Sequence, residues 1–106
     1  MEISEDKKIQ LLYRVEPGCL GPTGAQIIEH FCVYANQHLS APYFAHYHFI
    51  PRFDKSKAER EYSINARLLS EPQVQTYLTH FKTTKDGFEE QLDELLTQAI
   101  ESFLER

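Results

Sequence analysis

Residues 43–68 read YFAHYHFIPRFDKSKAEREYSINARL, and apolar residues alternate with polar ones in two parts of this segment. The first part runs from Tyr43 to Phe53 and the second from Glu59 to Leu68. A period of two is typical of strands that bury one face. The apolar side of the two strands comprises Tyr43, Ala45, Tyr47, Phe49, Tyr62, Ile64, Ala66 and Leu68. We therefore expect both strands to face one core.

The connection between these strands predicts how they pair. Pro51 has no N–H to donate to a neighbour, which places the strand over residues 43–53 at a sheet edge. The charged residues 54–57, DKSK, are typical of a turn. A hairpin follows, in which the apolar faces coincide when His48 lies opposite Ser63 and His46 opposite Asn65.

Another alternating segment precedes this pair. Residues 8–15, KIQLLYRV, predict a strand, and the glycine- and proline-rich residues 16–24 predict a loop. Apolar residues then recur at helical spacing, which indicates a helix over about 23–38. Thr23 followed by Gln26 matches a capping box at its start.

Two more helices are expected after the hairpin. Ser70, Pro72 and Gln73 are typical of a capped helix start, and the helix is expected to end near residues 82–84. A long final helix follows, with acidic residues on its outer side. Its core-facing side comprises Phe88, Leu92, Leu95, Leu96, Ala99, Phe103 and Leu104.

The element order is β-α-β-β-α-α, which predicts an α+β fold with helices packed on one face of the sheet. We expect a three-stranded, mainly antiparallel sheet of order 1-3-2, which resembles a ferredoxin-like pattern without its last strand. Direct parallel pairing of the strand over residues 8–15 with the strand over residues 43–53 is the alternative. The chain is expected to form one domain over residues 1–106, with residues 1–7 as a disordered start.

Composition and charge exclude several classes of protein. With 42% hydrophobic residues in 106, the chain can bury a core without disulfides or a structural metal. A net charge of -5 disfavours nucleic acid as a partner. No apolar run approaches the roughly 20 residues that cross a bilayer, so no membrane partner is expected. Without an export signal, Cys19 and Cys32 are expected to be reduced in the cytoplasm.

The face of the sheet opposite the helices is expected to be open and half-apolar. This favours a protein-interaction or regulatory domain that forms a homodimer through this face or an edge strand. The predicted contact residues are Arg14, Phe44, His46, His48, Ile50, Arg52, Asn65 and Arg67. Residues 84–106 hold seven acids against Lys85 and Arg106. The acidic face of the last helix is thus either simply solvated or a docking surface for a basic protein partner.

A small-ligand or metal-binding domain is the alternative function. Gly18, Cys19, Gly21 and Gly24 lie in the loop before the first helix, where backbone N–H groups bind anions in many folds. His46 and His48 stand two apart on one strand, so both imidazoles project from one face and two nitrogens can reach one metal. No spacing of nucleophile and base is recognisable, so catalytic residues and a cofactor are not predicted.

Overall fold

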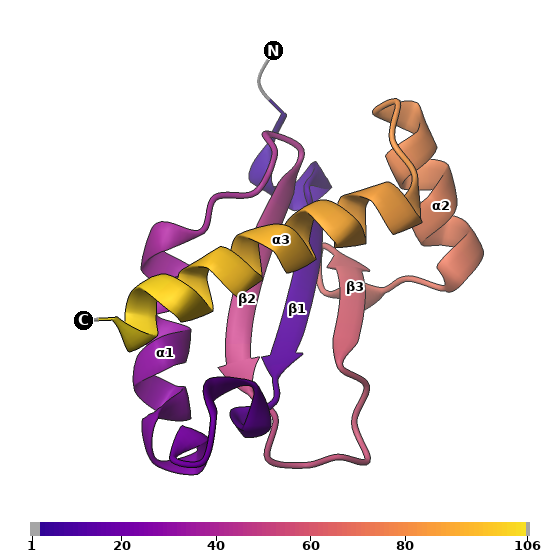
Figure 1. Ribbon diagram of the computed structural model, residues 1–106. Helices are drawn as coiled ribbons and strands as arrows, with labels where there is room; N and C mark the ends of the chain where they lie inside the picture. The colour runs from indigo at the N-terminus through magenta and orange to yellow at the C-terminus, as the bar shows by residue number, and fades with distance from the viewer. Residues whose placement is uncertain (1–2, 106) are drawn as a thin grey trace.

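The computed structural model describes residues 3–105 (Figure 1). The α-helices are α1 (Gly24–His38), α2 (Glu71–His80) and α3 (Lys85–Leu104), and the strands are β1 (Ile9–Val15), β2 (Ala45–Pro51), β3 (Arg60–Ile64) and β4 (Arg67–Leu68). Two short 3-10 helices, η1 (Glu5–Lys7) and η2 (Pro17–Leu20), flank β1. The expected α+β class is confirmed. Of the start predicted to be disordered, residues 1–2 lie outside the described residues.

The sheet is mixed and has the order β2-β1-β3-β4. β1 pairs with β2 in parallel and with β3 in the antiparallel sense. The predicted order 1-3-2 is therefore wrong, and so is the hairpin pairing of His48 with Ser63. The alternative, parallel pairing of the first two strands, is confirmed, as is the edge position of the Pro51 strand.

The burial of β1 explains its central position. Ile9 and Leu11 are 0% exposed and Val15 is 1% exposed, so β1 supplies the innermost apolar row of the sheet. A strand between two neighbours also satisfies its main-chain groups on both sides. The segment 52–59 is long enough to pass from β2 to the far side of β1, whereas a tight hairpin would have excluded β1 from this place.

The predicted strand over residues 59–68 is in fact two strands, β3 and β4. Asn65 and Ala66 connect them with φ angles of 50° and 67°. Two consecutive residues with positive φ are typical of a type I′ turn, whose twist matches that of the flanking strands. Asn tolerates this region, but Ala at this position is strained.

Helix starts are set by side-chain caps at two of the three α-helices. The Ser70 Oγ accepts from the Gln73 N–H, and the Gln73 side chain accepts from the Ser70 N–H at 2.8 Å, which confirms the capping box of α2. The Thr84 Oγ1 caps α3 by accepting from the Gly87 N–H at 3.0 Å. The capping box expected at Thr23 is wrong, because Thr23 has a ψ of 12° and its side chain makes no cap hydrogen bond.

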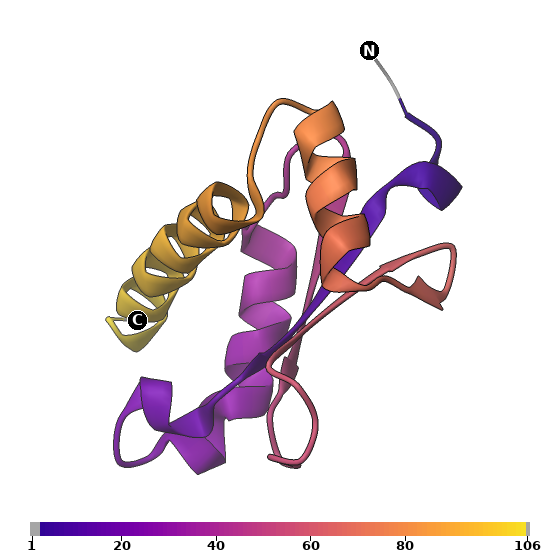
Figure 2. The same ribbon diagram turned by 90° about the vertical axis from the view of Figure 1, so that its right-hand side faces the viewer.

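All three α-helices pack against one face of the sheet (Figure 2). The core lies between them and includes Ile28 and Phe31 of α1, Leu78 of α2 and Leu92 of α3, each 0% exposed. The opposite face of the sheet carries no α-helix among residues 3–105 (Figure 2). None of the helices in these residues is long and apolar enough to span a membrane.

Candidate functional site

The uncovered side of the sheet is the first candidate surface. Strand alternation and the observed register determine which side chains project from it. We call it the open sheet face, and it comprises Gln10, Leu12 and Arg14 of β1, His46, His48 and Ile50 of β2, Glu61 and Ser63 of β3, and Leu68 of β4. Leu68 is 72% exposed, and Leu12 and Ile50 are half-buried. The face thus combines three aliphatic side chains with polar ones.

Arg14 and Glu61 compensate each other on this face. The Arg14 Nη1 donates to the Glu61 Oε1 at 2.8 Å and to the Ala58 carbonyl at 2.6 Å. Arg14 is only 8% exposed. Its guanidinium therefore holds the segment before β3 against β1 and adds no net charge to the open sheet face.

The other predicted contact residues lie in different places. Phe44 is 7% exposed, and its ring stacks on Phe81 with centroids 4.4 Å apart, so placing Phe44 on the open face is wrong. Phe44 precedes β2 and turns towards α2, which removes it from the strand alternation. Arg52 donates to Glu16 at 2.7 Å and to the Lys57 carbonyl at 3.1 Å, which fixes the segment after β2. Asn65 occupies the type I′ turn and Arg67 is exposed on β4.

The histidine pair of β2 lies on the open sheet face, as expected from its spacing. His46 contacts the carboxylate of Glu5 in η1, and His48 is exposed. Within residues 3–105, His, Cys, Asp and Glu side chains form no group of three that could hold a metal ion. The structure therefore brings a single carboxylate to one of the two imidazoles.

The glycine loop is a tight structural connection between β1 and α1. A Cβ on Gly24 would lie 1.7 Å from the Pro17 carbonyl oxygen, so only glycine allows η2 to contact the start of α1. Gly21 has a φ of 90°, and Gly18 lies in η2. The loop follows the end of β1, whereas His46 pairs with Gln10 near its beginning. His48 pairs with Leu12 in the middle of β1, so the loop and the two histidines lie along different parts of this strand.

Neither cysteine has the surroundings of a reactive thiol. Partial burial and the carboxylates of Glu16 and Glu59 raise the pKa of the Cys19 thiol. Burial and the Glu29 carboxylate raise the pKa of Cys32 to about 11. A thiol with a raised pKa is mostly protonated at neutral pH and therefore a weak nucleophile.

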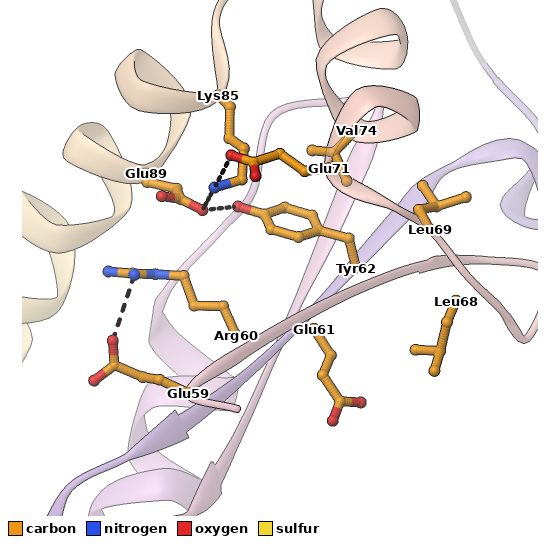
Figure 3. A pocket seen from close by; sticks show the side chains of 10 residues that line it. All are labelled: Glu59, Arg60, Glu61, Tyr62, Leu68, Leu69, Glu71, Val74, Lys85 and Glu89. Atoms are coloured by element: carbon orange, nitrogen blue, oxygen red, sulfur yellow. Dashed lines mark hydrogen bonds and ion pairs between the residues drawn. The ribbon is translucent and has the colours of Figure 1, made fainter. Parts of the chain in front are cut away.

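The second candidate surface is a cleft that the sequence did not predict. It has a volume of about 520 Å³ and lies between β3 and the first turns of α2 and α3 (Figure 3). We call it the β3 cleft, and its lining residues are Glu59, Arg60, Glu61, Tyr62, Leu68, Leu69, Glu71, Val74, Lys85 and Glu89. Tyr62 and Arg60 point from β3 towards α3, whereas Glu61 points to the opposite side (Figure 3).

Charged contacts connect the two walls of the β3 cleft. The Tyr62 hydroxyl donates to Glu89 at 2.5 Å, and the Lys85 Nζ lies 3.2 Å from Glu89 and 3.8 Å from Glu71 (Figure 3). Burial, together with the hydrogen bond to Glu89, raises the pKa of the Tyr62 phenol. The i,i+4 spacing of Lys85 and Glu89 was visible in the sequence, but their contact with Tyr62 depends on how α3 crosses the sheet.

A further residue that sequence reasoning missed is Asn36 of α1. Its Nδ2 donates to the Phe49 carbonyl at 2.9 Å, and its Oδ1 accepts from the Phe49 N–H at 2.8 Å. The amide thereby takes the place of a neighbouring strand on the outer edge of β2. Nothing in the local sequence around Asn36 indicates this contact, because Phe49 is thirteen residues away.

Comparisons with known proteins found no matching family model, no similar curated protein and no similar solved structure.

Proposed function

We propose that this protein is a small protein-interaction domain that forms a homodimer through its open sheet face. The observation that supports this is the absence of any α-helix over this face among the described residues, although Leu12, Ile50 and Leu68 project from it. Parallel strand pairs such as β1 and β2 are usually covered on both faces. A second sheet packed face to face would cover these side chains.

Charge favours a second copy as the partner on this face. Arg14 and Glu61 neutralise each other, while α3, which carries several exposed acids, lies on the opposite side of the sheet (Figure 2). Two copies therefore approach through their open faces without bringing their acidic helices together. In a two-fold dimer each apolar residue near the axis also meets the equivalent apolar region of the other copy.

Dimer formation through the outer edge of β2 is less favourable than dimer formation through the open sheet face. Asn36 occupies the main-chain groups of Phe49, and Pro51 has no N–H to offer. A strand from another chain would have to displace the Asn36 amide. The two free thiols, Cys19 and Cys32, suit a reducing compartment, so we place the dimer in the cytoplasm.

The test is the subunit number measured by light scattering and native mass spectrometry. The wild-type protein should be a dimer, and Ile50→Asp should give a monomer because it buries a carboxylate at the interface. Val33→Asp is the matched control, because Val33 is an exposed aliphatic residue of α1, 56% exposed and away from this face. Circular dichroism verifies that both variants are folded. A monomeric wild type, or a dimer unchanged by Ile50→Asp, would refute the proposal.

A further inference from the structure

The free edge of β3 lies inside the β3 cleft. The Arg14 N–H donates to the Glu59 carbonyl at 2.7 Å, so Glu59 and Glu61 direct their main-chain groups towards β1. The main-chain N–H and C=O groups of Arg60 and Tyr62 therefore point to the edge of β3 that faces away from β1. There the Tyr62 carbonyl accepts from the Leu69 N–H at 2.8 Å.

Beyond Tyr62 this edge has no neighbouring strand in the described part of the chain. β4 pairs only with Ser63 and Ile64, and after Leu69 the chain turns away into α2. Among the described residues, no group accepts from the Arg60 N–H and none donates to its carbonyl. A sheet edge with an unpaired N–H and C=O is a template for another strand.

The β3 cleft gives an added strand room and side-chain contacts. Its volume of about 520 Å³ is in the range of pockets that bind ligands in proteins. Leu69 and Val74 provide an apolar part of the wall, and Tyr62 rises beside them (Figure 3). An extended segment lying along Arg60 would thus place alternate side chains towards α2 and α3.

The charge of the β3 cleft selects what it binds. Four carboxylates and two cations line it, but one of the carboxylates, Glu61, points to the opposite side and pairs with Arg14. Both cations are already paired, Arg60 with Asp93 at 3.1 Å and Lys85 with Glu89 at 3.2 Å. The Glu71 side chain is 72% exposed and lies 3.8 Å from Lys85, so it can accept a further cation. The exposed acids Glu90, Asp93 and Glu94 of α3 extend this negative field.

We infer that the β3 cleft binds an extended segment of another protein that carries lysine or arginine, by strand addition at Arg60. The main-chain hydrogen bonds of Arg60 supply affinity that does not depend on sequence. The carboxylates, Glu71 above all, supply the preference for cationic side chains. The β3 cleft shares Glu61 and Leu68 with the open sheet face, but Arg60 and Glu71, on which this inference rests, lie outside that face, so it does not depend on the proposed dimer.

The experiment is selection from a random seven-residue peptide library displayed on phage, followed by synthesis of the selected peptides. We expect enrichment of lysine and arginine and chemical-shift changes at the Arg60 and Tyr62 amides on titration. A peptide N-methylated at its central residues should lose binding, because it cannot form the ladder hydrogen bonds. Glu71→Lys should weaken binding about tenfold. Glu29 is an exposed residue of α1, and Glu29→Lys, which changes the net charge by the same amount, should leave binding unchanged.

Four outcomes would overturn the inference. They are no enrichment over a control without protein, enrichment of acidic or purely apolar peptides, equal binding by Glu71→Lys, and equal binding of the N-methylated peptide. A dimer that Glu71→Lys dissociates would show instead that a second copy occupies the β3 cleft. Amide spectra of Glu71→Lys in the absence of peptide verify that the sheet is intact.

Discussion

The outer edge of β2 and the edge of β3 that faces away from β1 differ in how their main-chain groups are paired. On β2, the Asn36 amide makes two hydrogen bonds with Phe49, and α1 thereby protects the edge. On β3, the chain leaves the sheet after Leu69, and the main chain of Arg60 has no partner among residues 3–105. An unpaired strand edge invites association with other chains, and proteins commonly block it with a side chain or a covering element. The contrast indicates that β2 is blocked at Phe49, whereas β3 is open at Arg60.

Removing the cap of β2 should have the largest effect. Asn36→Ala deletes two hydrogen bonds and leaves the N–H and carbonyl of the 1%-exposed Phe49 unpaired. We expect the free energy of unfolding to fall by about 2–3 kcal/mol, measured by urea denaturation. Asn36→Asp is the matched variant, because it keeps an acceptor for the Phe49 N–H but places a carboxylate oxygen against the Phe49 carbonyl. An Asn36→Ala variant as stable as wild type would mean that the amide does not secure this edge.

Two tyrosines on the strands that flank β1 extend the contrast between β2 and β3. Tyr62 of β3 donates to Glu89, whereas Tyr47 of β2 has no hydrogen-bond partner among the described residues. Tyr62→Phe should lower the free energy of unfolding by about 1–2 kcal/mol, because it leaves the Glu89 carboxylate without that donor. Tyr47→Phe should be close to neutral in the same urea titration. Equal losses in the two variants would contradict a specific role for the contact between β3 and α3.

The smallest effect is expected at the turn beside the free edge. Ala66 has a φ of 67°, a region that glycine occupies without strain. Ala66→Gly creates the Asn-Gly pair preferred in type I′ turns and should stabilise the protein by roughly 0.5 kcal/mol, visible as a raised melting temperature. Leu68→Gly in β4 should lower it and serves as the comparison, because glycine weakens a strand. A destabilised Ala66→Gly variant would show that the strain relieved in the turn is smaller than the conformational entropy that glycine adds to the unfolded chain.

Patterns local in the sequence predicted most elements. The alternation of residues 8–15, the helical spacing after Gly24 and the capping box of Ser70 and Gln73 all correspond to observed elements. The local rule failed at Thr23, where the backbone conformation of the loop prevents capping. It also missed the turn at Asn65 and Ala66, because Ala is not a usual residue for positive φ.

Periodicity and covalent chemistry correctly predicted the α+β class, the amphipathic faces of β1, β2 and β3 and the edge position of the Pro51 strand. The prediction that Leu68 faces the core is wrong, because the turn at Asn65 and Ala66 reverses the chain and leaves Leu68 72% exposed on the open sheet face. The position of β1 between β2 and β3 follows instead from tertiary packing. Alternation specifies which face of a strand is buried but not which strand is its neighbour. The cap at Asn36 and the contact of Tyr62 with Glu89 join residues far apart in the chain, so they exist only once the helices have packed on the sheet.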